Sequence, residues 1–184
     1  MKAILISTLP KACKAIASGE QTLLLTKRLP KLETPFKTYL YCRKGGEGYF
    51  YTTWLDENRL QHSEECLGKV IGEFVCDKID EYYANDRGWY IYPQDETCLW
   101  TDEIAGYGKG ETLYGWHISE LKIYDKPKKL SEFRKPCLYG DLPCWECPSC
   151  DRDEKDNLIQ CFNTLSRPPQ SWCYVEELEE SDHV

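Results

Sequence analysis

The sequence predicts an α+β fold that is mostly β, either a small barrel or a highly curved sheet decorated by short helices. Five or six segments show the alternating or closely spaced apolar residues of strands, whereas only one stretch has a convincing amphipathic helical pattern. Regular winding of parallel strands would need such helices between successive strands. A length of 184 residues with 41% hydrophobic residues is typical of one domain with a substantial core.

The N-terminal part of the chain predicts strands around one helix. Residues 2–8 (KAILIST) predict a buried strand, because the apolar residues are too closely spaced for one helical face. Residues 10–19 (PKACKAIASG) predict a helix with a proline in its first turn and a glycine at its C-terminal end. Strands are also expected at residues 22–27 (TLLLTK) and 36–42 (FKTYLYC), on either side of a loop with two prolines.

The remainder of the chain predicts mainly strands. The clearest is residues 68–82, in which β-branched and aromatic residues alternate with polar ones, as in a central strand. Residues 83–112 are expected to hold one short helix, within the stretch CLWTDEIAGYG. Further strands are expected after the glycine-rich turn of KGGEGYFYTTW and at residues 114–127 and 167–178.

Basic residues are concentrated at the N-terminal end of an acidic chain. The net charge of −8 argues against indiscriminate coating of nucleic acid, since such binding depends on many cations that face phosphates. Residues 1–44, however, hold nine Lys and Arg side chains against two Glu, a balance of +7, so the remaining residues carry −15. A local basic surface suits a site for one anionic ligand or a short strand, although solvated lysines on scattered faces would give the same count.

Five of the eleven cysteines fall within one short segment, and their spacing predicts a structural zinc ion. Three of them form a C-x-x-C-x-x-C run, and two thiolates at C-x-x-C spacing can turn toward one tetrahedral ion. Reduced cysteines in a surface loop, or an iron–sulfur or redox role, are the alternatives. We expect one zinc ion held by four of Cys137, Cys144, Cys147, Cys150 and Cys161.

The sequence lacks the motifs of several classes of enzyme, and also those of membrane spans and signal peptides. There is no HExxH pattern, phosphate-binding Walker loop or dinucleotide fingerprint. No apolar run approaches the roughly 20 residues that span a bilayer, and the start lacks the pattern of a signal peptide. We therefore expect a cytoplasmic protein that has no membrane partner.

The order of the segments resembles the ASCH domain group of the PUA-like superfamily, in a version typical of phages and mobile elements of Firmicutes. The resemblance rests on KAILIS, the helix after it, GEQT, PKLETPFKTYLYC, GKVIGEFVCDKI and the terminal PPQSWCYVEE. It implies a single PUA-like β-barrel domain over residues 1–184 with a helix-lined cleft, interrupted by the Cys-rich insertion at about residues 134–165. Relatives of this kind bind RNA or modified nucleobases, and a few are amidohydrolases of acetylated cytidine or ribonucleases.

The family signature near the first helix is altered in this sequence. The signature is G-x-K-x-x-E-x-R, and the resemblance implies that its charged side chains face the cleft. Here Gly19 is followed by Gln21 at the Lys position, Leu24 at the acidic position and Thr26 at the Arg position. Gln21 can hydrogen-bond to a base edge but cannot act as a titrating amine, and Leu24 cannot exchange a proton.

Six residues are expected to contact a ligand in the cleft: Gln21, Lys27, Arg28, Tyr41, Glu73 and Trp116. Lys27 and Arg28 could replace the lost cations, and strand alternation predicts that at most one of them faces the cleft. Glu73, on the predicted central strand, could face either a barrel interior or solvent.

Aromatic residues close to basic ones form a second signal for nucleic acid. Such a mixture stacks bases and neutralises phosphates, although core packing is expected to take most of the rings. The basic residues are Lys37, Arg43 and Lys44, and the aromatic ones are Tyr39, Tyr41, Tyr49, Phe50, Tyr51 and Trp54.

The altered signature favours a noncatalytic module that binds RNA, a nucleotide or a modified nucleobase in the cleft. One alternative is an enzyme of ASCH type, an amidohydrolase or ribonuclease, that uses Lys27, Arg28 or Glu73 in place of the lost residues. Another is a phage accessory protein that sequesters a host protein or a nucleotide signal.

Overall fold

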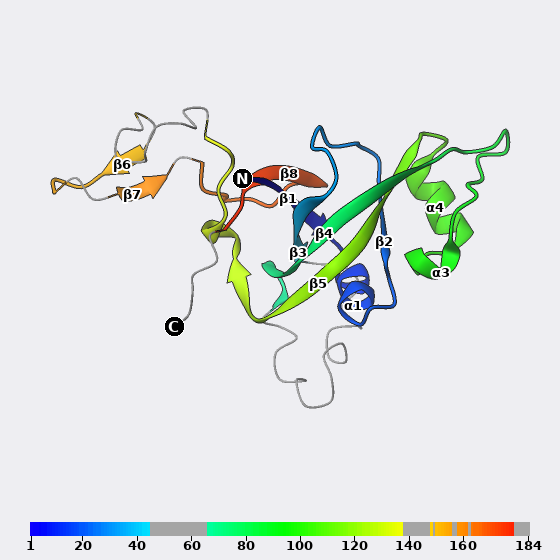
Figure 1. The fold of residues 1–184 in the computed structure, drawn as a ribbon, viewed down its shortest axis with the longest axis horizontal. Helices are drawn as coiled ribbons and strands as arrows, with labels where there is room; N and C mark the ends of the chain where they lie inside the picture. Colours follow the sequence, from blue (N-terminus) through cyan, green and yellow to red (C-terminus); the bar gives the residue numbers. More distant parts are fainter. Residues whose placement is uncertain (45–65, 138–147, 149, 156–157, 162, 179–184) are drawn as a thin grey trace.

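The computed structural model describes residues 1–44, 66–137, 148, 150–155, 158–161 and 163–178 and shows a mixed sheet with short helices (Figure 1). Six strands form the main sheet in the order β2-β5-β4-β3-β1-β8, and β6 and β7 form a separate hairpin. The strands are β1 (Lys2–Thr8), β2 (Leu23–Thr26), β3 (Phe36–Cys42), β4 (Lys69–Tyr82), β5 (Leu113–Lys129), β6 (Cys150–Arg152), β7 (Leu158–Cys161) and β8 (Trp172–Glu176). The helices are α1 (Pro10–Ala17), α3 (Gln94–Thr97), α4 (Thr101–Gly108) and the 3₁₀ turn η2 (Leu130–Glu132).

The predicted mostly-β, α+β fold is confirmed, but the sheet is open rather than closed into a barrel within the described strands. β1 and β3 run parallel, and every other neighbouring pair is antiparallel. β2 pairs with β5 alone and β8 with β1 alone, so these two strands form the edges. The pairing of the long strands β4 and β5 shifts register three times, and such bulges bend a sheet locally.

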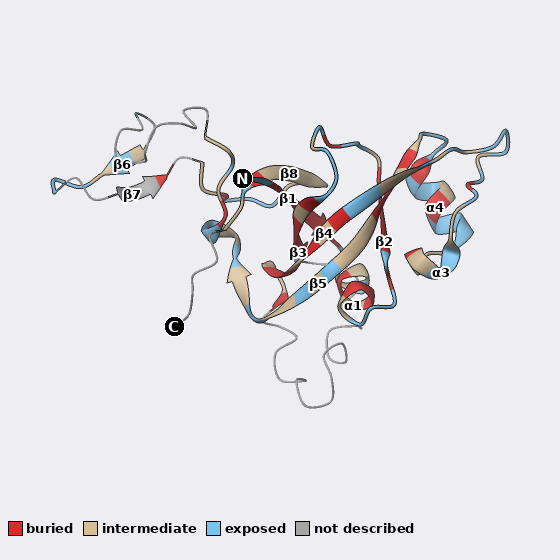
Figure 2. Ribbon diagram, viewed as in Figure 1, coloured by how far each residue is buried: buried red, intermediate tan, exposed pale blue. Residues whose placement is uncertain are grey.

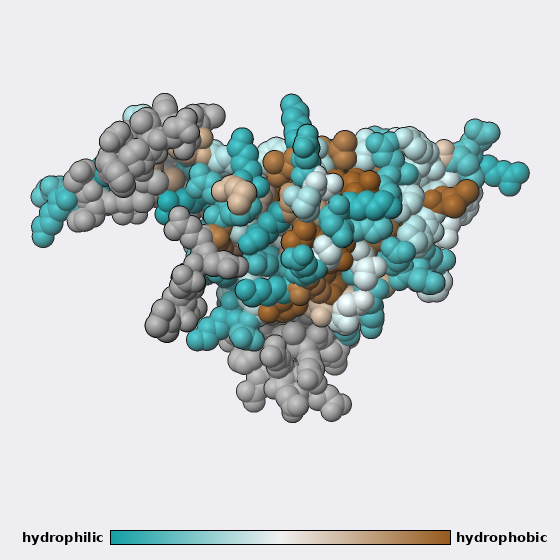
Figure 3. All heavy atoms as spheres, in the orientation of Figure 1, coloured by the Kyte–Doolittle hydropathy of each residue, from teal (hydrophilic) through white to brown (hydrophobic). Residues whose placement is uncertain are grey.

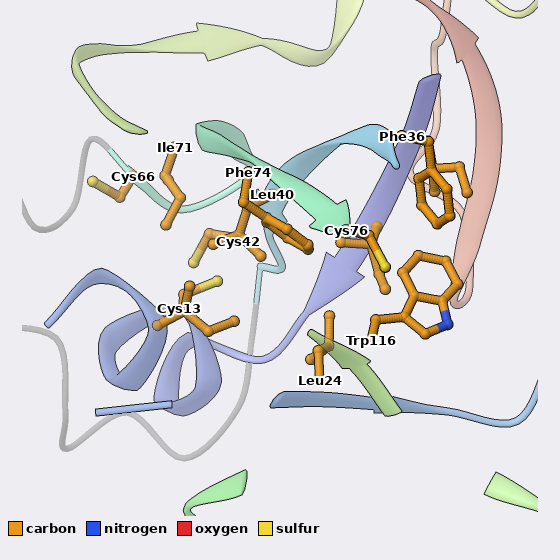
Figure 4. Packing of buried hydrophobic residues seen from close by; sticks show 13 residues of the cluster. Cys13, Leu24, Phe36, Leu40, Cys42, Cys66, Ile71, Phe74, Cys76 and Trp116 are labelled. Carbon is orange, nitrogen blue, oxygen red and sulfur yellow. The ribbon is translucent and has the colours of Figure 1, made fainter. Parts of the chain in front are cut away.

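The largest apolar cluster lies between the sheet and α1, where buried residues gather (Figure 2; Figure 4). Cys13 and Ile16 are one helical turn apart and both are fully buried, so α1 lies with this side against the sheet. Alternation along β1 directs Ile4 and Ile6 to the same cluster. The helix therefore has a fixed position at the end of β1.

The opposite face of the sheet holds a second cluster. It contains Ala3 and Leu5 of β1 together with Tyr39 and Tyr41 of β3. Phe133 is fully buried there, with its ring centroid 4.9 Å from that of Tyr39. This contact fixes the chain just after η2 against the sheet.

The segment between β4 and β5 folds over β2. Ile104 of α4 is fully buried and packs in a third cluster with Leu23 and Leu25. One short helix was expected in residues 83–112, and the structure has two, α3 and α4. Helix α4 thus lies beside the end of β2, at the opposite end of the molecule from the β6–β7 hairpin (Figure 1).

The strands predicted at residues 2–8 and 36–42 match β1 and β3, and the prediction at 68–82 is met by β4 with a start one residue later. The β6–β7 hairpin within the Cys-rich insertion was not predicted. The aromatic strand expected after the glycine-rich turn lies outside the described residues. Hydrophilic residues cover much of the face in Figure 3, with hydrophobic residues visible between them across its middle. No helix in the part of the chain that the structure describes is long and apolar enough to cross a membrane.

Candidate functional site

An open cleft of about 780 Å³ lies where β1 and β3 end, between the start of α1, the end of β2 and α4. Thr8 and Cys42 are partners at the ends of the parallel strands, so the loops after them leave the sheet at the same edge. The backbone N–H of Arg43 donates to the carbonyl of Thr8 at 3.0 Å and joins the two loops. The first turn of α1 borders the cleft through Leu9 and Ala12.

Gln21 lines the cleft and is held in place by the end of α1. Helix α1 ends at Ala17, and Gly19, just beyond its C-cap Ser18, has a φ of 79°, a left-handed conformation that suits glycine. The N–H of Gln21 donates to the carbonyl of Ala15 at 2.9 Å, and its Nε2 donates to the carbonyl of Leu23 at 3.0 Å. Within the described chain its Oε1 accepts no hydrogen bond, so this oxygen is the atom that can accept one from a ligand.

The three consecutive leucines of β2 divide between two clusters. Leu23 and Leu25 face Ile104 of α4, whereas Leu24 points into the cluster under α1 (Figure 4). Leu24 and Leu25 also border the cleft. The strand is therefore an apolar wall of the cleft, with Gln21 at one end and two cations at the other.

Lys27 and Arg28 both line the cleft, so the expectation that at most one of them could do so is wrong. Strand β2 ends at Thr26, and both basic residues lie in the turn that follows, where strand alternation no longer applies. The Thr26 hydroxyl donates to the carbonyl of Arg28 at 3.1 Å and stabilises this turn.

Both glutamates that line the cleft, Glu103 and Glu111, are paired with lysines, of which Lys27 lines the cleft as well. Nζ of Lys27 lies 3.1 Å from Oε2 of Glu111, and Nζ of Lys11 lies 3.3 Å from Oε1 of Glu103. Glu103 also accepts the N–H of Trp100 at 2.8 Å and so caps the first turn of α4. The Lys11–Glu103 pair ties α1 to α4, and the Lys27–Glu111 pair ties the segment after β2 to the segment before β5.

Arg28 and Arg43 form no ion pair with a carboxylate anywhere in the described chain. Both side chains are exposed and both line the cleft. The Arg28 guanidinium carbon lies 5.3 Å from the centroid of the Trp172 ring, within the range of a cation–π contact. Because the two lysine–glutamate pairs cancel, these arginines give the cleft its positive balance.

Tyr107 of α4 presents an aromatic ring beside the cations. It is 41% exposed, and Nζ of Lys27 lies 5.4 Å from its ring centroid. Partial burial raises the pKa of Tyr107 above its ordinary value of 10.0, so the hydroxyl is protonated at neutral pH. The sequence analysis names Arg43 only among the basic residues near aromatic ones and does not name Tyr107, because the place of both at the cleft depends on pairings between distant segments.

The other three expected ligand residues do not line this cleft. Trp116 is fully buried in the cluster under α1, and Tyr41 is 4% exposed on the opposite face of the sheet. Glu73 also lies on that opposite face, where Lys37 Nζ is 3.7 Å from it and the Tyr124 hydroxyl donates to it at 2.5 Å. Burial and this hydrogen bond raise the pKa of Tyr124, so the hydroxyl remains a donor to Glu73. Of the aromatic residues expected to stack bases, Tyr39 is also buried, and Tyr49, Phe50, Tyr51 and Trp54 lie outside the described residues.

The structure places two of the clustered cysteines opposite each other. Cys150 of β6 and Cys161 of β7 are direct partners in the hairpin, and Cys137 precedes the insertion. Cys144 and Cys147 lie outside the described residues. Among the residues that are described, no three His, Cys, Asp or Glu side chains are grouped to hold a metal ion.

The open mixed sheet with a cleft beside its first helix has the fold of ASCH proteins of known structure. Crystal structures of ASCH proteins from Zymomonas mobilis are similar to it. A tyrosine-to-phenylalanine variant of ZmASCH is 18% identical, with a TM-score of 0.50 over 71% of this chain and 77% of that chain. The ASCH protein of the same organism is 19% identical, with a TM-score of 0.49 over 70% of this chain and 73% of that chain. At 18% identity, the similarity to the tyrosine-to-phenylalanine variant shows the fold alone. No protein-family model and no curated protein matches the sequence.

Proposed function

We propose that this chain binds a nucleotide unit of RNA in the cleft and does so without catalysis. The observation that carries the proposal is the pair of arginines, Arg28 and Arg43, which line one cleft and have no carboxylate partner within the described chain. They stand beside an aromatic ring and a buried amide, Tyr107 and Gln21. Cations, a ring and an amide together match the phosphate, the base face and the base edge of a nucleotide.

The phosphate would lie between the arginines. A guanidinium has planar donors that match phosphate oxygens, and it stays charged at any physiological pH. The first turn of α1 also favours a phosphate at this place. Leu9, the residue at its N-terminus, forms no side-chain hydrogen bond with the backbone N–H groups of this turn. Backbone N–H groups at a helix N-terminus favour an anion.

The base would lie against the leucine wall. Leu24 and Leu25 offer apolar surface, and Oε1 of Gln21 can accept a hydrogen bond from an exocyclic amine or ring N–H of the base. Tyr107 offers a partly exposed ring for stacking.

The same geometry supports binding rather than turnover. The amide of Gln21 does not titrate, and its nitrogen is already engaged by a backbone carbonyl. Leu24 has no polar group, and the raised pKa of Tyr107 keeps its hydroxyl from acting as a base near neutral pH. Glu103 and Glu111 are each engaged by a lysine.

The test is a fluorescence-anisotropy titration of a short single-stranded RNA with the full chain. The double change Arg28→Gln and Arg43→Gln should weaken binding by about 1.5–3 kcal/mol for each arginine that contacts phosphate. The matched control, Lys122→Gln with Lys126→Gln, removes two exposed charges that do not line the cleft and should leave the affinity nearly unchanged. Equal losses in both variants would contradict the proposal, and so would cleavage of the RNA or hydrolysis of acetylated cytidine by the unaltered chain.

A further inference from the structure

A second basic pocket, of about 470 Å³, lies along the edge strand β8 and outside the cleft. Three lysines line it, each from a different segment: Lys2 begins β1, Lys31 lies in the loop after β2, and Lys135 follows η2. No lining residue is acidic, and in the described chain none of the three lysines forms an ion pair. We call this site the lysine pocket; its other lining residues are Leu32, Pro136, Cys173 and Tyr174.

Backbone contacts hold the lysine pocket together. The N–H of Lys31 donates to the Tyr174 hydroxyl at 2.7 Å, which fixes the loop after β2 against β8. The N–H of Lys135 donates to the carbonyl of Asn163 at 2.8 Å, next to the fully buried Phe133. Three like charges are thus gathered on a fixed backbone, an arrangement that an anionic ligand stabilises.

A row of aromatic rings connects the lysine pocket with the cleft. Arg28 of the cleft lies over the ring of Trp172, whose centroid is 5.3 Å from that of Tyr174. Trp172 and Tyr174 alternate along β8, so both rings lie on the same face of the strand, and both are partly exposed. Tyr174 in turn lines the lysine pocket.

We infer that the lysine pocket is a second phosphate-binding site for the same RNA strand, which runs from the cleft over Trp172 and Tyr174 to Lys31, Lys2 and Lys135. The inference rests on the proposed function and names its ligand as a single strand of several nucleotides. Cations that follow the backbone, combined with rings that contact bases, are how proteins bind single strands without reading their sequence. An acidic peptide would use the lysines but would have no need of the aromatic row.

The experiment compares two probes on the full chain: a 5′-phosphorylated dinucleotide, which fits the cleft alone, and a single-stranded RNA of about ten nucleotides. The triple variant Lys2→Gln, Lys31→Gln and Lys135→Gln should lose roughly tenfold or more in affinity for the longer RNA at about 0.1 M salt. The slope of log affinity against log salt should become shallower by about 2, because each of the three lost phosphate contacts contributes roughly 0.7. Its affinity for the dinucleotide should stay within about twofold.

The matched control is Lys122→Gln, Lys126→Gln and Lys155→Gln, which removes the same charge from exposed positions outside both pockets. An unchanged affinity of the lysine-pocket variant for the longer RNA would overturn the inference while leaving the proposed function intact. Equal loss in the control triple would also overturn it. If the unaltered chain bound neither probe, both proposals would be wrong. Competition by polyglutamate as strong as that by RNA would assign the lysine pocket to an acidic peptide instead.

Discussion

Lys27 Nζ forms an ion pair with Glu111, at 3.1 Å from Oε2, while its sequence neighbour Arg28 has no carboxylate partner in the described chain. The two cations line the same cleft but differ in availability. The charge of Lys27 is already balanced, and the guanidinium of Arg28 instead lies over the Trp172 ring. The pair therefore separates a structural cation from one that can bind an anion.

This difference predicts unequal effects of two single changes. Arg28→Gln should weaken RNA binding by about 1.5–3 kcal/mol and lower the salt slope by roughly 0.7, the effect of one lost phosphate contact. Lys27→Gln should change the salt slope less, because it removes a cation that Glu111 already neutralises. Anisotropy titrations at several salt concentrations measure both quantities. Identical slopes for the two variants would show that Arg28 has no special role.

Gln21 offers a test of base recognition. Gln21→Ala removes the only side-chain oxygen that we place against the base and should weaken nucleotide binding by about 1–3 kcal/mol, the usual loss when a buried polar partner is left unpaired. The change also removes the hydrogen bond to Leu23, so the unfolding free energy must be measured in parallel. Gln21→Met, which keeps the length of the side chain, is the control for packing. Full affinity in both variants would remove Gln21 from the site.

The sequence locates much of the fold because alternation and proline–glycine signals are local. Strands β1 and β3 and helix α1 follow directly from residues 2–19 and 36–42. The parallel pairing of β1 with β3 is not local, and it brings Arg43 to the cleft. Likewise, Tyr107 reaches the cleft through the packing of Ile104 against β2. Arg43 belongs to the basic and aromatic signal of its own segment, but that signal does not place it at this cleft, and Tyr107 has no signal on its own helix.

A related reason explains why some of the expected ligand residues do not line the cleft. Alternation shows that Trp116 and Glu73 point to particular faces of their strands, but it does not say which face is covered. Trp116 lies on the α1 side of the sheet, where it is fully buried beside Phe36, and Glu73 lies on the other side. Gln21, Lys27 and Arg28 were predicted together because the resemblance to the family signature places Gln21 at its Lys position and the two cations just beyond its end. All three line the same cleft.

The zinc site expected in the Cys-rich insertion stays a prediction, since Cys144 and Cys147 lie outside the described residues. Cys150 lies opposite Cys161 in one hairpin, and we propose that two of Cys137, Cys144 and Cys147 complete a closed four-cysteine zinc site. Purified protein should contain about one zinc per chain by elemental analysis, and Cys147→Ser should lose most of it. Cys98→Ser, outside the insertion, is the control. Metal-free wild-type protein purified with zinc present would rule the site out.

The Asp80 carboxylate makes stability depend on pH. Hydrogen bonds from Lys78, at 2.8 Å, and His117, at 2.7 Å, lower the pKa of Asp80 below its usual value of 3.8. A folded-state pKa below the unfolded one contributes stability that is present above about 3.8 and is lost as pH falls through the folded-state pKa. Asp80→Asn should therefore lower the unfolding free energy at pH 7 by about 0.2–1 kcal/mol, a difference that shrinks in acid. Chemical denaturation at several pH values measures it, with Lys78→Gln expected to give part of the same change. A difference that stays constant from pH 7 to acid would contradict this role.

The central claim, that the cleft binds RNA through Arg28 and Arg43, is tested most directly by an NMR titration that follows side-chain signals. Addition of a short single-stranded RNA should shift the Nε–H signals of Arg28 and Arg43 and the Nε2 signals of Gln21, and should leave that of Arg87, which does not line the cleft, in place. Shifts centred instead on Glu73 and Tyr124, across the sheet, with both cleft arginines unmoved, would contradict the claim.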